Sequence, residues 1–242
     1  MNRGIYTAAN GMNACQTWMD VVSNNLANAT TTGFKRDDLV FQDALLRQMN
    51  ANGGTGAPMG TMPSGMSARN SATIFTVGDL NATDNPLDLA ITTDRGLFGV
   101  QDEFGKKFYT RDGSFRLNDQ QQLTTRAGLL VLDNREQPIQ FPPDVQRIVI
   151  DVQGNVSVND QAIAQLGVFD GNFTKHGNQL YVAQSASLVG QTILAPNSLE
   201  SSNVNMVQSM IQMIELQRSF EMGQRAIQNQ DESTGQLLQA LR

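Results

Sequence analysis

Few side chains in this sequence could carry out catalysis. It holds one histidine, His176, and one cysteine, Cys15, far apart in the chain, which is a poor basis for a Cys/His metal site. The adjacent carboxylates Asp102 and Glu103 fall in an expected turn, where neighbouring side chains project apart and cannot share a proton. No serine has a nucleophile motif around it, and no glycine-rich phosphate-binding loop is present. We therefore expect a protein that is not an enzyme and needs no cofactor.

Two patterns that resemble metal sites have simpler explanations. The stretch from Asp151 to Asp160 lacks the acidic spacing and the closing glutamate of a calcium-binding loop. Met206, Met210 and Met213 repeat at helical spacing, which indicates packing, since methionine adapts to irregular neighbours. No metal site is expected.

Composition excludes further classes of function. The chain has 242 residues and a formal charge of −6, which argues against nucleic acid or an anionic membrane as its main partner. No apolar run approaches the roughly 18 residues of a membrane span. The N-terminus shows no cleavable signal-peptide pattern, so general secretory logic predicts a protein that stays in the cytoplasm.

The last part of the chain predicts one long helix. Asn205 and Gln208 have the spacing of a capping box, and a helix from there to the end would be roughly 55 Å long at about 1.5 Å per residue. Its apolar residues form two adjacent rows, one of Met206, Met210, Met213 and Phe220, the other of Val207, Ile211 and Ile214. An apolar arc this broad must be covered by several neighbours.

The N-terminal region, residues 4 to about 28, predicts a partner for that helix. Its apolar residues alternate at spacings of three and four over about three heptads, as in a coiled-coil seam: Ile5, Ala8, Met12, Cys15, Met19, Val22 and Leu26. Trp18 lies off the seam, as an anchor between subunits or as local packing. One partner leaves the second row of the long helix open, so we expect other chains to cover it; the alternative is a two-helix hairpin inside a monomer's core.

The middle of the chain changes to short alternating runs separated by turn residues, which predicts one antiparallel β domain over residues 72–199. The fold class is therefore α+β, with terminal helices paired as a coiled coil and an inserted all-β domain. Residues 1–71 and 200–242 would form a discontinuous helical core with an extended linker, flexible over about 50–70. Within it, Asp37–Met49 could be a short helix or an extended arm. The charged run Lys35–Asp38 could be solvated or could set the register between subunits.

Several stretches closely resemble one known family, the bacterial flagellar rod and hook proteins. They are MNRGIYTAANGM (1–12), SNNLANATTTGFKRDDLVF (23–41), GDLNATDNPLDLAI (78–91), YTRDGSF (109–115) and SNVNMVQSMIQMIELQRSFEM (202–222). The resemblance implies a structural subunit whose terminal helices pair in an inner tube, whose segment after the stretch 23–41 packs between subunits, and whose β domain lies outside.

The resemblance also implies location and partners. These are copies of the chain, other rod or hook subunits and the flagellar type III export apparatus, with no nucleic acid and no membrane span, in a rod that crosses the periplasm. The expected subunit-packing residues are Ile5, Met12, Trp18, Met19, Val22, Leu26, Phe34, Lys35, Val207, Ile211, Ile214, Phe220 and Ile227.

Within the family, the opening MNRGIYTAA and the phrase RSFEMGQRAI (218–227) resemble proximal-rod members most. A distal-rod member is the competing interpretation, because the Met/Gly-rich segment 50–70 is similar to a loop of that type. A hook subunit would need a larger outer insertion. A different class, a surface adhesin with a helical stalk, predicts clustered aromatic residues on the β domain.

Overall fold

A computed structural model describes residues 3–43, 47–50, 58–62, 66–145, 147–159, 161–177, 179–190 and 193–240. Its helices are α1 (Arg3–Ala27) and α2 (Met206–Ala240). Its strands are β1 (Asp37–Asp43), β2 (Arg47–Asn50), β3 (Pro58–Met62), β4 (Met66–Thr73), β5 (Leu80–Ala82), β6 (Leu89–Ile91), β7 (Leu97–Gln101), β8 (Lys107–Thr110), β9 (Phe115–Leu117), β10 (Leu123–Thr125), β11 (Leu130–Val131), β12 (Ile148–Ile150), β13 (Asn155–Val158), β14 (Gln161–Gln165), β15 (Val168–Lys175), β16 (Leu180–Leu188), β17 (Leu194–Pro196) and β18 (Ser198–Glu200).

The chain divides into two compact units. The first, the helical unit, contains residues 1–27, 37–72 and 205–242, and the second, the β unit, contains 28–36 and 73–204. The α+β class expected from the sequence is thus observed. The expected domain boundaries differ in detail, since residues 28–36 and 200–204 pack in the β unit and not with the helices.

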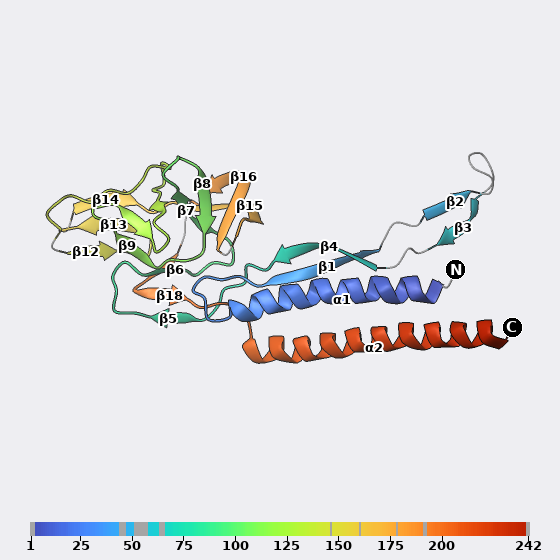
Figure 1. The fold of residues 1–242 in the computed structure, drawn as a ribbon. Helices are drawn as coiled ribbons and strands as arrows, with labels where there is room; N and C mark the ends of the chain where they lie inside the picture. The colour runs from blue at the N-terminus through green and yellow to red at the C-terminus, as the bar shows by residue number, and fades with distance from the viewer. Residues whose placement is uncertain are drawn as a thin grey trace. The chain divides into compact units, whose positions relative to one another are not determined.

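In the helical unit, α1 and α2 run antiparallel and side by side (Figure 1). The α2 helix begins where the sequence predicts, because the Asn205 side-chain oxygen accepts a hydrogen bond of 3.1 Å from the backbone N–H of Gln208. Its 35 residues give a length of about 52 Å. No helix in the described part of the chain is long and apolar enough to span a membrane.

The described residues of the segment 37–49 are extended, not helical. Strand β1 pairs with β4, and β2 pairs antiparallel with β3, so residues 37–43 and 47–49 agree with the extended arm of the two alternatives. Residues 50, 58–62 and 66–70 lie in β2, β3 and β4. The other residues of 50–70 lie outside the described part, so the expected flexibility there stays a prediction.

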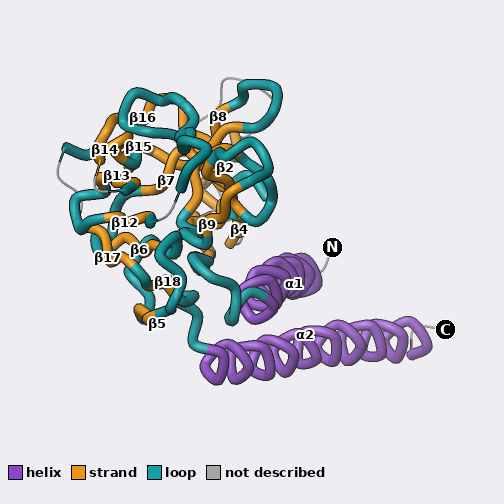
Figure 2. The backbone as a smooth tube through the Cα atoms, turned by 90° about the vertical axis from the view of Figure 1, so that its left-hand side faces the viewer, coloured by secondary structure: helices purple, strands orange, loops and turns teal. Residues whose placement is uncertain are grey.

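In the β unit, seven strands form one antiparallel sheet in the order β15-β16-β8-β7-β11-β10-β9. Strand β15 also pairs with β7, through Val168↔Phe98, so that β7, β8, β16 and β15 close into a ring. A three-stranded sheet, β12-β13-β14, and the pairs β17-β6 and β18-β5 complete the unit, as the tube in Figure 2 shows.

Two clusters of apolar side chains form the core of the β unit. The larger one is mainly aliphatic and includes Leu89, Ile91, Phe98 and Leu123. The smaller one is aromatic and contains buried Tyr109, Phe169 and Tyr181, against which Phe75 and Phe173 pack. The aromatic cluster is therefore mostly internal, whereas the adhesin alternative would require it at the surface.

The short antiparallel strands expected for the middle of the chain are observed. After β4 ends at Thr73, an irregular segment leads to β5. Gly171 and Asn172 lie within β15, where the register with β16 shifts between Gly171 and Phe173, as at a β-bulge.

Gly33 lies at the end of the connection that follows α1, and the backbone conformation at this position requires glycine. Its φ is +68°, and a Cβ there would lie 2.6 Å from the backbone carbon of Arg111. Its N–H donates to the carbonyl of Glu200 at 2.7 Å. Because it has no Cβ, Gly33 can approach two segments that are distant from it in the sequence.

Candidate assembly surface

One side of α2, which we call its seam side, carries buried and half-buried residues. They alternate at spacings of four and three: Ser209, Met213, Leu216, Phe220, Gly223 and Ile227. At Gly223 the two helices come close, because a Cβ there would lie 2.8 Å from Cγ of Met12. On α1, Met12, Met19 and Leu26 are half-buried and Val22 is buried.

The opposite side of α2 carries an uncovered apolar surface, which we call the outward apolar face. It consists of Met206, Val207, Met210, Ile211 and Ile214, all exposed, with Val207 at 68 %. At about 100° per residue these side chains centre on the side away from the seam.

The outward apolar face covers only the first turns of α2. Farther along the same side of the helix the exposed residues include Arg218, Glu221 and Arg225, together with one apolar side chain, Met222, which is 64 % exposed. Isolated exposed apolar residues are ordinary, but five on three turns form a patch of the kind found where proteins associate.

The expected subunit-packing residues thus separate into three groups. Val207, Ile211 and Ile214 belong to the outward apolar face. Met12, Met19, Val22, Leu26, Phe220 and Ile227 lie on the faces where α1 and α2 meet, and Trp18 is half-buried on α1. The structure describes the backbone but not the side chain of Ile5.

Phe34 and Lys35 form the third group, and their position differs from the expectation. Both side chains are buried within the β unit, with Lys35 at 0 % exposure, so the chain itself covers them and no neighbouring subunit can contact them directly. The Lys175 ammonium lies 4.3 Å from the centre of the Phe34 ring, in a cation–π contact. The charged run at 35–38 therefore begins with a core residue.

Lys35 belongs to a buried ionic network centred on Glu200. The Lys35 ammonium pairs with Oε1 of Glu200 and also donates to the carbonyl of Thr76 at 2.6 Å. Arg111 pairs with the other carboxylate oxygen, Nε to Oε2 at 2.6 Å. The backbone N–H of Gly78 donates to Oε1 at 2.9 Å. One carboxylate thus holds two cations that are distant in sequence.

The remaining donors of Arg111 are satisfied by backbone carbonyls. Its guanidinium donates to Gly96 at 2.6 Å, to Ile91 at 3.0 Å and to Thr93 at 2.5 Å. In the described part of the chain no buried side-chain nitrogen or oxygen lacks a partner. The network therefore meets the condition under which charges can be buried.

Asn203 supports the same junction through the backbone. Its side-chain oxygen accepts from the N–H of Arg36 at 2.8 Å, and its amide nitrogen donates to the carbonyl of Ile74 at 2.9 Å. Together with Glu200 it holds the segments 33–36, 74–78 and 200–203 side by side. Sequence reasoning missed Arg111, Glu200 and Asn203 as functional residues, although Arg111 and Asn203 lie inside the motifs quoted above.

Burial lowers the pKa of the Lys35 amine from its ordinary value of 10.5, and this effect exceeds the opposing one of its hydrogen bond and charge pairing with Glu200. Within the described residues no group of three or more His, Cys, Asp or Glu side chains could hold a metal ion. The ionic network around Glu200 is suited to holding segments of the chain together.

We predict that Glu200→Gln lowers the free energy of unfolding of the β unit by about 3–5 kcal/mol, because it leaves two buried cations without their counter-ion. Glu136→Gln is the matched control. Glu136 pairs with Lys107 at the surface, where both side chains are more than 40 % exposed, so its loss should cost at most about 1 kcal/mol. Urea denaturation measures both values, and equal losses would contradict the role assigned to the network.

The lowered pKa of Lys35 predicts a pH dependence. Between that lowered pKa and about 10.5, the unfolded chain keeps a proton that the folded chain has released, so stability rises with pH in this window. The free energy of unfolding of the natural chain, relative to Lys35→Met, should therefore increase with pH as the pH approaches 10.5 from below. A difference that stays constant over this range would show that burial does not perturb the amine.

Three family models match separate parts of the chain. Residues 5–35 match "Flagella basal body rod protein", residues 90–158 match "Flagellar hook protein FlgE/F/G D1 domain", and residues 195–240 match "Flagellar basal body rod FlgEFG protein C-terminal". The first covers the whole seam on α1 and the loop to Lys35, and the third covers Glu200, Asn203 and α2.

Full-length relatives agree with these matches. The flagellar basal-body rod protein FlgG of Buchnera aphidicola subsp. Schizaphis graminum is 33 % identical over 262 aligned positions, covering 97 % of this chain and 98 % of the relative. FlgG of Bacillus subtilis is 32 % identical, covering 98 % of each. FlgF of Caulobacter vibrioides is 32 % identical over 228 positions, covering 91 % of this chain and 90 % of the relative. The chain therefore belongs to the flagellar basal-body rod family, and is a structural subunit of the flagellar rod and not an enzyme.

Proposed function

We propose that copies of this chain and related rod or hook subunits assemble through the outward apolar face of α2, while α1 and α2 form a coiled coil within each copy. The observation that carries this proposal is the division of α2 into two apolar sides. The seam side is covered by the chain's own α1, and the other side has no cover in the described structure.

The chemistry of the outward apolar face favours a protein partner of similar character. Five flexible or branched aliphatic side chains offer a dry contact with no buried polar group to satisfy. The charged residues Arg218, Glu221 and Arg225, on the same side farther along, can pair with opposite charges on a neighbour. Apolar burial would supply affinity, and these charges would select the register.

Contacts between subunits would also explain why the chain has few charged residues. Only 17 % of the chain is charged, and Gln and Asn are common on the exposed sides of α2. Such a surface resembles the polar rim of a protein–protein interface more than the surface of a protein that stays monomeric. We place the assembly in a rod that spans the periplasm, after export through the flagellar type III apparatus, with no nucleic-acid partner.

Within the family, we propose that this chain is a proximal-rod, FlgF-type subunit. The alignment with Buchnera FlgG has 262 positions, more than the 242 residues of this chain, so it must leave gaps in this chain. The alignment with Caulobacter FlgF has 228 positions and covers 91 % of the chain. The shorter chain thus fits the FlgF type with less interruption, although the identities are equal within two per cent.

This assignment predicts position along the rod. A tagged chain should cross-link, in intact basal bodies, to subunits at the membrane-proximal part of the rod and not to hook subunits. Mass spectrometry of the cross-linked basal bodies would identify the neighbours. Cross-links mainly to the hook would instead support the distal-rod alternative.

The proposal for α2 predicts that Ile214→Asp weakens self-association at least about 100-fold, because an unpaired carboxylate would be buried in the contact. Gln217→Asp is the matched control, since it adds the same charge one turn later on an exposed, polar part of α2. Sedimentation velocity measures association, and thermal unfolding of the β unit verifies that both variants fold. Normal assembly and normal swimming with Ile214→Asp would refute the proposal.

A further inference from the structure

A second exposed apolar group lies on the β unit, at the turn between β7 and β8. Phe104 is 94 % exposed, more than any other large apolar side chain in the described part of the chain. The turn that carries it is well fixed. The Asp102 carboxylate accepts hydrogen bonds from the N–H groups of Phe104 at 2.9 Å and Lys106 at 2.8 Å, and Gly105 adopts a φ of +83°. The backbone thus holds an aromatic ring in solvent.

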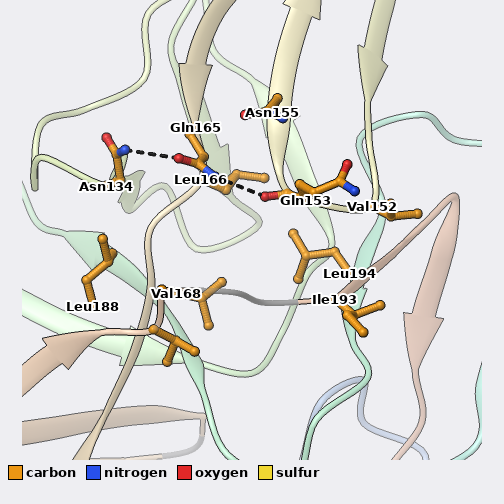
Figure 3. A pocket seen from close by; sticks show the side chains of 12 residues that line it. Asn134, Val152, Gln153, Asn155, Gln165, Leu166, Val168, Leu188, Ile193 and Leu194 are labelled. Atoms are coloured by element: carbon orange, nitrogen blue, oxygen red, sulfur yellow. Dashed lines mark hydrogen bonds between the residues drawn. The ribbon is translucent and has the colours of Figure 1, made fainter.

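The same unit has a hollow of about 480 Å³ that matches such a ring in chemistry (Figure 3). Its apolar walls include three side chains that are themselves exposed: Val152, Leu188 and Ile193, the last at 63 %. None of the described residues that line it is ionisable. An aliphatic hollow without charge favours a neutral aromatic or aliphatic group over a phosphate or a charged peptide.

Amide side chains fix one wall of this hollow. The Asn134 amide donates to the side-chain oxygen of Gln165 at 3.1 Å, and the Gln165 amide donates to the carbonyl of Gln153 at 3.2 Å, as the dashed lines in Figure 3 show. These bonds connect two turns, at Asn134 and Gln153, to the end of β14 at Gln165. The hollow is therefore preorganised, which lowers the entropy that an incoming group would lose on binding.

The ring and the hollow lie toward opposite ends of strand β7. At its beginning, Phe98 pairs with Val168, which lines the hollow. At its end, Gln101 leads directly into the turn that carries Phe104. Four steps of roughly 3.3 Å along β7, plus the turn, separate the two sites. The high exposure of Phe104 agrees with this separation, since a ring inside its own hollow would be buried.

We propose that Phe104 of one copy inserts into this hollow on the β unit of the next copy. A contact between two different patches of identical chains is head-to-tail, and it repeats into an open-ended stack when the rotation does not close a ring. The proposal rests on the self-assembly proposed above and adds a second contact to it, through the β unit. The occupant is a second copy because the same chain presents both complementary parts, at opposite ends of one strand.

The first test compares variants in the full chain. Phe104→Ser should weaken self-association about 10- to 100-fold, the range expected for burying one phenylalanine ring. Ile193→Asp, on the hollow, should weaken it at least as much. Val149→Ser removes an exposed valine that does not line the hollow, so it should leave association unchanged. Sedimentation velocity gives the association constants, and thermal unfolding shows that each variant folds.

The second test identifies the site that the ring contacts. A photoreactive benzoylphenylalanine replaces Phe104, labelled and unlabelled chains are mixed and assembled, and mass spectrometry locates the cross-links. Links between different copies to peptides that contain residue 152, 188 or 193 support the proposal. Links to any other surface, to another protein, or within one copy overturn it.

The two proposals fail separately in these experiments. If Ile214→Asp abolishes assembly while Phe104→Ser leaves it intact, the contact through the β unit is wrong and the helical one stands. If Phe104 cross-links to the hollow of another copy while Ile214→Asp assembles normally, the α2 proposal is wrong and the contact through the β unit stands.

Discussion

The β unit depends on one buried carboxylate. Glu200 holds Lys35 and Arg111, which come from segments 165 and 89 residues away in the chain, and its backbone carbonyl also accepts from Gly33. Removing three charges from water costs several kcal/mol for each, and only full hydrogen bonding offsets it. A hydrophobic cluster of similar size could be as stable, but it would accept the three segments in several registers. We infer that the network is retained because it permits a single register.

That register decides where the chain enters and leaves the β unit. Residues 28–36 follow α1, and Asn203 precedes α2 by only two residues, Val204 and Asn205. Glu200 and Asn203 fix these connections to the segment 74–78, which itself follows β4. Three of the four chain positions where one unit ends and the other begins, 36/37, 72/73 and 204/205, therefore lie within a few residues of this hydrogen-bonded network.

The sequence predicted those features that depend on local periodicity. The N-terminal helix, the cap at Asn205 and the short antiparallel strands of the middle of the chain follow from patterns within a short window, and the structure confirms them. The role of Lys35 could not be predicted in this way. Beside Arg36, Asp37 and Asp38 it resembles a solvated charge, and its buried state depends on a carboxylate that sequence spacing does not connect to it. Likewise, the sequence identifies Asp102 and Glu103 as adjacent carboxylates. In the structure the residue that follows them, Phe104, is the unusual one, because its ring is exposed to solvent.

Two contacts of different kind suit a long assembly better than one. The outward apolar face of α2 does not by itself fix the position of a neighbouring copy. Aliphatic side chains pack against any apolar surface, and the free energy of the contact differs little between neighbouring positions. A ring in a preorganised hollow accepts one position only, and the charged stretch of α2 adds a further constraint. Apolar helix packing would thus provide most of the association free energy, and the knob-in-hollow contact would select one displacement between successive copies. A rod that transmits torque needs a fixed displacement between copies as much as it needs affinity. Subunits that could slide along the outward apolar face would not hold their positions under load.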